Sequence, residues 1–258
     1  MLELVPAGVE ESTLGDGTVE YAVYGAPGEL PAMPDLTAVA GEALVEVRSE
    51  EVADDWAERW RGFHRPLVID SRLAVRPPWE PEIGAGVELI IDPGQAFGTG
   101  AHATTRLCLE ALLELPAGGA LVDLGCGSGV LAIAAARLGW APVLALDLEA
   151  VAVQAAAANA RQNGVHLEVE RYDVRGGPVE RSVAPTVVAN LLAPLLNGWA
   201  ARLRDAPELP ETVIASGLLV SEADRVAESF GGLGFAEAKR LTQAEWAALV
   251  LTSVTSRR

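Results

Sequence analysis

The stretch that most constrains the fold is residues 121–129, which read Leu-Val-Asp-Leu-Gly-Cys-Gly-Ser-Gly. An apolar strand, Ala120–Leu124, leads into this glycine turn, and Val130–Gly139 predicts a helix after it. A second apolar strand, Val143–Leu146, ends at the carboxylate of Asp147. This order indicates a βαβ nucleoside-binding unit, because glycines let the backbone approach a ligand and a carboxylate can accept both ribose hydroxyls.

The spacing of the glycines separates two kinds of cofactor. A dinucleotide fold uses Gly-x-Gly-x-x-Gly, whose third glycine lets the helix begin close to a pyrophosphate. Here the turn is Gly125-x-Gly127-x-Gly129, and Val130 occupies the position of that third glycine. Asp123, two residues before the turn, would sit poorly beside a pyrophosphate but suits the ammonium and sulfonium groups of S-adenosylmethionine (SAM). Two alternatives stay open: a turn whose glycines serve only packing, and a nicotinamide or flavin dinucleotide site.

Asp147 and Asn190 are the polar side chains expected to act on the ligand. Asp147 would accept the 2′- and 3′-hydroxyls of the ribose, although a solvated carboxylate at the end of a strand is the alternative. Asn190 follows a short predicted strand, Thr186–Ala189, and the carboxyl ends of strands line the ligand crevice of open α/β sheets. Its amide oxygen can accept a hydrogen bond from an incoming amine, so Asn190 is the candidate catalytic residue.

Charge and composition narrow the classes of partner. The 258 residues carry a formal charge of −17, which repels nucleic-acid phosphates and would attract a basic protein. Acidity that only keeps the protein soluble is the alternative. No apolar run reaches the roughly 18–20 residues that span a bilayer, and the first residues do not resemble a signal peptide, so we expect a cytoplasmic protein without a membrane partner. The two cysteines, Cys108 and Cys126, are too few for a structural zinc site, and no metal is expected.

The chain divides into three predicted regions. Residues 1–52 form a small α/β domain, 53–86 a linker with a helix and a proline-rich connector, and 87–258 a larger α/β domain. In the first region the pattern predicts, in order, the strand Val19–Tyr24, the helix Leu36–Glu42 and the strand Ala43–Arg48. In the linker, Trp56 and Trp60 share one face of a predicted helix, and the prolines after it favour extended or turning backbone.

The larger domain alternates strands and helices, which indicates a mostly parallel sheet covered on both faces. The last two predicted strands of this domain form an antiparallel pair. Beyond the βαβ unit, the predicted elements are the helix Val151–Asn163, the strands His166–Tyr172 and Thr212–Ser216, the helix Glu222–Leu233, and the strands Phe235–Thr242 and Trp246–Ser253.

Three motifs resemble the ribosomal protein L11 methyltransferase family. The most specific is residues 92–105, Asp-Pro-Gly-Gln-Ala-Phe-Gly-Thr-Gly-Ala-His-Ala-Thr-Thr, which is similar to that family's signature loop over the cofactor. The second comprises the tryptophans of the linker, with Phe63, Pro66 and Pro78-Trp79 after them. The third is Asn190-Leu191. The resemblance covers about residues 53–255 and implies a Rossmann-like class I methyltransferase sheet.

The resemblance also implies residue roles. Cofactor contacts fall on Thr105, Gly125, Asp147 and Asn190, beside Asp123 and Gly127 from the turn. Four loop residues would form a lid: Phe97, Gly98, Thr99 and Gly100. His102 matches a histidine of that loop, with a structural and a catalytic role both open. Ala101 and Ala103 depart from the polar residues common there.

The family's substrate-recognition domain resembles a ferredoxin-like unit, and the resemblance implies that the first region supplies only its later part. Leu2-Glu3-Leu4 and Val9-Glu10-Glu11 are interpreted as the tail of its first helix, so the domain would be truncated or its start misassigned. The implied function is SAM-dependent methylation of lysine or α-amino groups of ribosomal protein L11 by a monomer without direct nucleic-acid contact. The alternatives are methylation of another protein or a small molecule, and a SAM-binding module without catalysis.

Overall fold

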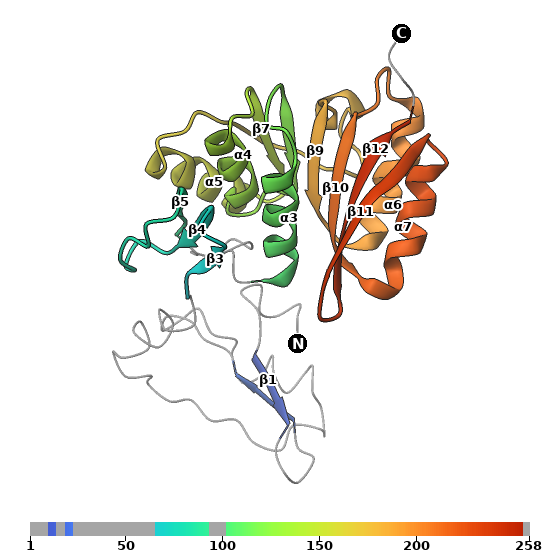
Figure 1. Cartoon of the computed structure of the whole chain (residues 1–258). Helices are drawn as coiled ribbons and strands as arrows, with labels where there is room; N and C mark the ends of the chain where they lie inside the picture. Colours follow the sequence, from blue (N-terminus) through green and yellow to red (C-terminus); the bar gives the residue numbers. More distant parts are fainter. Residues whose placement is uncertain (1–9, 14–18, 23–64, 93–101, 255–258) are drawn as a thin grey trace. The chain divides into compact units, whose positions relative to one another are not determined.

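The computed structural model describes residues 65–92 and 102–254 in full, and residues 10–13 and 19–22 by their backbone (Figure 1). The chain forms two compact units, residues 1–58 and 59–258. In the first unit, strand β1 (Glu10–Thr13) pairs antiparallel with β2 (Val19–Ala22). The predicted strand that begins at Val19 is therefore confirmed over β2.

The interpretation of Glu10 and Glu11 as the tail of a helix is wrong, because both lie in β1. Pairing with β2 satisfies the backbone groups of this segment and outweighs the helix propensity of glutamate. The predicted helix Leu36–Glu42, the strand Ala43–Arg48 and the helix with Trp56 and Trp60 lie outside the described residues.

The second unit is built on a seven-stranded sheet in the order β11-β12-β10-β9-β6-β7-β8. The strands from β10 to β8 are parallel, whereas β12 runs antiparallel to both β10 and β11. This confirms the predicted fold class. The strands are β6 (Leu121–Leu124), β7 (Val143–Asp147), β8 (Glu168–Arg171), β9 (Thr186–Asn190), β10 (Thr212–Leu219), β11 (Phe235–Gln243) and β12 (Trp246–Ser253).

Helices cover both faces of this sheet, as predicted for parallel strands (Figure 1). One face carries the helices α3 (Ala103–Glu114), α4 (Val130–Leu138) and α5 (Ala150–Gln162), and the other α6 (Ala193–Arg202) and α7 (Ala223–Gly231). Short 3-10 turns occupy Val179–Ser182, Leu203–Asp205 and Val220–Glu222. The predicted helices correspond to α4, α5 and α7, whereas α3 and α6 have no counterpart among the predictions.

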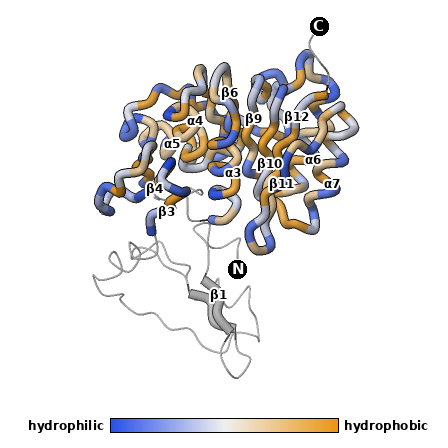
Figure 2. Tube along the Cα trace, in the orientation of Figure 1, coloured by the Kyte–Doolittle hydropathy of each residue, from blue (hydrophilic) through white to orange (hydrophobic). Residues whose placement is uncertain are grey.

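Alternation along the strands separates two hydrophobic cores. Leu121 faces α3 and α4, whereas Val122 and Leu124 face α6 and α7. Figure 2 shows hydrophobic residues concentrated along the inner strands, with hydrophilic residues at the outer turns. Asp123 shares the parity of Leu121, and this places its carboxylate on the side of α4.

A second sheet lies on the first core, in a part of the chain for which extended or turning backbone is predicted. Strand β3 (Leu67–Ile69) pairs antiparallel with β4 (Leu73–Arg76), and β4 pairs parallel with β5 (Val87–Ile90). Leu73, Leu89 and Ile91 are buried against α3 and α4. Within the described residues, no helix is both long and apolar enough to cross a membrane.

Candidate functional site

A cavity of about 330 Å³ lies at the carboxyl ends of β6, β7 and β9. Its size falls within the range of small-molecule sites, and its position is where open α/β sheets bind their ligands. Residues from the glycine turn, from the ends of β7, β8 and β9, and from α3 and α6 line it: Thr105, Leu124, Gly125, Cys126, Gly127, Val130, Leu131, Leu146, Asp147, Leu148, Tyr172, Asp173, Val174, Arg175, Asn190, Leu191 and Leu195.

The glycine turn takes a shape that side chains would prevent. Gly125, Gly127 and Gly129 have φ angles of 80°, 53° and 81°, in the left-handed region that favours glycine. A Cβ on Gly125 would lie 2.4 Å from Cδ2 of Leu191, and one on Gly129 would lie 2.9 Å from Cβ of Ala156. The first glycine therefore lets the end of β9 approach the turn, and the third lets α4 begin against α5.

Asp147 lines the cavity from the end of β7, as predicted. Its Oδ2 accepts a hydrogen bond from the backbone N–H of Gly127 at 2.8 Å, and its Oδ1 accepts one from that of Glu149 at 3.0 Å. Each carboxylate oxygen can accept a second hydrogen bond. The carboxylate is thus fixed in orientation and keeps acceptor capacity for a pair of neighbouring hydroxyl groups.

Asn190 and Thr105 meet at the cavity although they are far apart in sequence. Nδ2 of Asn190 lies 3.4 Å from Oγ1 of Thr105 and donates to it. Oδ1 of Asn190 is buried and has no hydrogen-bond partner within the described residues. A buried acceptor without a partner is costly, so this oxygen is prepared for a donor on a bound molecule.

Asp123 lies behind the glycine turn and is not among the residues that line the cavity. Its side chain is fully buried, and its Oδ2 accepts a hydrogen bond from the N–H of Ala132 in α4 at 3.0 Å. Burial raises the pKa of this carboxyl to about 7, with the Ala132 hydrogen bond opposing the rise and the charge of Asp147 adding to it. Its Oδ1 is buried and has no hydrogen-bond partner within the described residues, and its contact with the cofactor stays a prediction.

The segment after β8 forms one wall of the cavity and was not predicted. Tyr172, Asp173, Val174 and Arg175 all line it. Asp173 accepts hydrogen bonds from the backbone N–H and Nε of Arg175, both at 2.9 Å, and the side-chain bond lowers the pKa of Asp173. Arg202 of α6 donates to the carbonyl groups of Val174 and Gly177. The predicted strand His166–Tyr172 could have indicated this wall. A strand parallel to β7 ends at the same edge of the sheet as β7, so the residues that follow it lie at the cavity.

His102 begins α3 as its N-cap. Its Nδ1 lies 2.8 Å from Oγ1 of Thr104 and accepts from the N–H of Thr104 at 3.4 Å. Its ring packs edge-on against Trp246, with centroids 4.8 Å apart. The predicted lid residues Phe97, Gly98, Thr99 and Gly100 lie outside the described residues.

Neither cysteine is placed as a nucleophile. Cys108 is fully buried, and Cys126 is nearly so although it lines the cavity. Burial raises the pKa of both thiols, which keeps them protonated near neutral pH. In the described part of the chain, no group of three or more His, Cys, Asp or Glu side chains could hold a metal ion.

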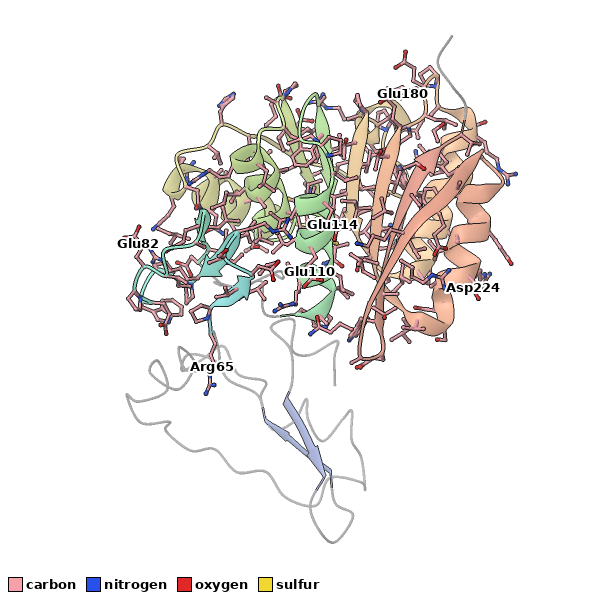
Figure 3. The ribbon with its side chains drawn as sticks, viewed as in Figure 1. Arg65, Glu82, Glu110, Glu114, Glu180 and Asp224 are labelled. Atoms are coloured by element: carbon pink, nitrogen blue, oxygen red, sulfur yellow. The ribbon has the colours of Figure 1, made fainter. Side chains whose placement is uncertain are left out.

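Several surface carboxylates have cationic partners. Figure 3 shows Glu110 and Glu114 projecting from α3 and Asp224 from α7. Glu110 pairs with Arg106 at 2.9 Å, Glu114 with Lys239, and Asp224 with Arg240 at 2.8 Å. These pairs neutralise part of the acidic surface, but 36 acidic residues against 19 basic ones leave a large excess of negative charge.

Comparisons with known proteins agree on one family. A family model described as ribosomal protein L11 methyltransferase matches residues 32–253. A relative of the same description from Gloeobacter violaceus is 41% identical over 76% of this chain and 62% of its own length. Another from Pelotomaculum thermopropionicum is 39% identical over 93% of this chain and 82% of its own. The crystal structure of a ribosomal protein L11 methylase from Lactobacillus delbrueckii subsp. bulgaricus is similar with a TM-score of 0.59 and 28% identity, over 73% of this chain and 98% of that one.

Proposed function

This chain belongs to the ribosomal protein L11 methyltransferase family, and on that premise we propose that it transfers methyl groups from SAM to amino groups of ribosomal protein L11. The acceptors would be lysine side chains, the α-amine, or both. The observation that carries the proposal is the buried Oδ1 of Asn190, an acceptor at the cavity without a partner in the described residues.

The residues that line the cavity fit SAM. Asp147 offers two fixed acceptors that suit the ribose hydroxyls, and the glycine turn leaves room for the nucleoside beside it. Asp173 adds a carboxylate at the neighbouring strand end, and apolar side chains such as Leu124 and Leu195 suit the adenine ring. When bound, SAM supplies a sulfonium methyl group that is already activated for displacement by an amine.

The task left to the protein is alignment of the amine, which in favourable cases is worth about 7–11 kcal/mol of the barrier. Oδ1 of Asn190 accepts a hydrogen bond from the amine and so directs its lone pair. Thr105 fixes the amide by accepting from its Nδ2. The amine must arrive neutral, and a lysine side chain is mostly charged below a pH of about 10.4, so partial desolvation at the apolar wall would favour its neutral form.

The proposal also names the acceptor, which is ribosomal protein L11. The relatives are named for ribosomal protein L11, and a net charge of −17 favours association with a basic protein. We place substrate recognition in residues 1–52, connected through 53–86 to a catalytic domain over 87–258, in a cytoplasmic monomer that does not bind nucleic acid directly. The chain spans 62% of the length of the Gloeobacter violaceus relative. Methylation of another protein or of a small molecule is the second candidate.

The experiment incubates the purified chain with labelled SAM and ribosomal protein L11, and maps the methyl groups by mass spectrometry. Asn190→Ala is the matched control for enzyme-dependent transfer. Much faster methylation of L11 amines by the wild type than by Asn190→Ala would support the proposal. Labelling of a different acceptor in preference to L11 would refute the substrate while retaining the reaction class.

A further inference from the structure

Asn159 of α5 and Asn163, which caps the C-terminus of that helix, lie along the outer edge of β5. Oδ1 of Asn163 accepts from the N–H of Ile90 at 2.8 Å, and its Nδ2 donates to the carbonyl of Ile90 at 2.7 Å. Oδ1 of Asn159 accepts from the N–H of Asp92 at 3.0 Å, and its Nδ2 lies 3.5 Å from the carbonyl of Asp92. Each carboxamide therefore presents a donor and an acceptor to one residue, Ile90 at the end of β5 or Asp92 just beyond it, as a neighbouring strand would.

The spacing of the two asparagines matches the strand they face. Four residues along a helix advance by about 6.0 Å, and two residues along a strand by about 6.6 Å. Asn159 and Asn163 thus reach Ile90 and Asp92 from one face of α5. The other edge of β5 pairs with β4, so the carboxamides satisfy backbone groups that the sheet leaves open.

Asn159 differs from Asn163 in one respect that connects it to the cofactor site. It is 3% exposed, and its Nδ2 donates to the carbonyl of Ser128 at 2.9 Å. Ser128 lies between Gly127, whose N–H binds Asp147, and Gly129. A single buried side chain therefore joins the glycine turn to Asp92, where the motif that resembles the family's signature loop begins.

We propose that Asn159 is a positioning residue of the methyltransferase: it holds the glycine turn and the end of β5 in one register and thereby sets the affinity for SAM. The inference rests on the proposed function, because the turn it supports is the proposed SAM site. Asn159 itself is not among the residues that line the cavity. Asn163 anchors the same strand, and its Nδ2 also donates to the carbonyl of Asn159 at 2.8 Å, but its side chain makes no bond to the turn, so it supplies the matched control.

The test compares Asn159→Ala with Asn163→Ala in the full chain, with S-adenosylhomocysteine (SAH) as the probe in calorimetry and thermal unfolding as the second readout. Both variants should lower the melting temperature, because both lose bonds to the edge of β5. Asn159→Ala should weaken SAH binding about tenfold, which corresponds to about 1.4 kcal/mol. Asn163→Ala should stay within about twofold of the wild type. Equal SAH affinity in the two variants would overturn the proposal.

Asn159→Asp supplies a second, nearly isosteric variant should the alanine variant not fold. Its carboxylate keeps an acceptor for the N–H of Asp92 but replaces the donor to Ser128 by a second acceptor, so SAH binding should fall as in Asn159→Ala. Wild-type affinity in this variant would contradict the role.

In the unaltered chain, saturating SAH should slow hydrogen exchange at the amide of Asp92 more than at the amide of Ile90. Identical slowing at both amides, or no slowing, would also contradict the role of Asn159. A wild-type chain that binds no SAH would instead refute the cofactor assignment itself.

Discussion

Replacing three glycines by alanine, one at a time, should separate the cost of backbone strain from the loss of ligand binding at the cavity. Gly125, Gly129 and Gly164 share positive φ angles of 80°, 81° and 64°. Nothing lies within 4 Å of the position that a Cβ would take on Gly164. On Gly129 the Cβ would lie 2.9 Å from Cβ and 3.0 Å from Cα of Ala156, and on Gly125 it would lie 2.4 Å from Cδ2 of Leu191.

The expected losses of unfolding free energy follow from these surroundings. The left-handed conformation costs an L-residue about 1–2 kcal/mol, which is the whole effect for Gly164→Ala. Gly129→Ala adds a clash with the backbone of a helix that cannot rotate away, so overpacking of about 1–3 kcal/mol brings its loss to about 2–5 kcal/mol. In Gly125→Ala the clashing atom ends a flexible side chain, so the loss should stay near that of Gly164→Ala. The displaced Leu191, however, lines the cavity.

Denaturant unfolding measures these losses of stability, and calorimetry with SAH measures the affinity of the cavity for its ligand. Gly125→Ala should combine the smaller loss of stability with at least about a tenfold rise in Kd, equivalent to about 1.4 kcal/mol. Gly164→Ala should show a similar loss of stability with unchanged Kd, which makes it the matched control. If Gly125→Ala bound SAH as tightly as Gly164→Ala, the assignment of this turn as the cofactor cradle would be refuted.

Three further predictions concern the polar groups of the site. Because burial raises the pKa of Asp123 from 3.8 to about 7, its contribution to stability should be complete below about pH 4 and decline as the pH rises to about 7; Asp123→Asn should flatten this slope in unfolding curves measured across that range. Asp147→Asn presents an amide to one of its two backbone N–H donors, so SAH affinity should fall by at least about tenfold in calorimetry, and unchanged affinity would exclude the ribose role. Asn190→Ala should bind SAH within about threefold of the wild type but transfer methyl groups about 100-fold more slowly, as measured by single turnovers with L11. A parallel loss of binding would show that Asn190 acts on the cofactor alone.

The sequence predicts those parts of the fold whose signal is local. The strands β6, β7 and β9 are short apolar runs with clear ends, and α4 is bounded by glycines at 129 and 139, so their limits follow from residue type. The β3–β5 sheet is different, because strands of three or four residues depend on partners that are distant in sequence. Helix α3 begins inside the motif of residues 92–105, whose glycines and proline hide the start of a helix.

The candidate site shows the same division between local and distant signals. Asp147 and Asn190 end strands, so their position at the cavity follows from topology alone. Asp123 lies behind the turn, because strand parity puts it with Leu121 on the side of α4. Its predicted contact with the cofactor stays a prediction. The wall after β8 was missed because Tyr172 and Asp173 belong to no motif, and only the register of β8 against β7 brings them to the site.

The orientation of Asn190 depends on two glycines, Gly125 of the turn after β6 and Gly217 of β10, as much as on its own strand. Leu191 follows it and donates its N–H to the carbonyl of Ser216 at 2.9 Å. A Cβ on Gly217 would lie 2.7–2.8 Å from backbone atoms of Leu191, and a Cβ on Gly125 would meet its side chain. β10 is irregular between Ala215 and Leu218, so its chain bends where it passes Leu191. Leu191 is therefore confined from both sides by positions that only glycine can occupy without a shift, and this confinement holds the amide that precedes it toward the cavity. Because the constraint is steric and comes from outside β9, Gly217→Ala should slow transfer even though Gly217 is not among the residues that line the cavity.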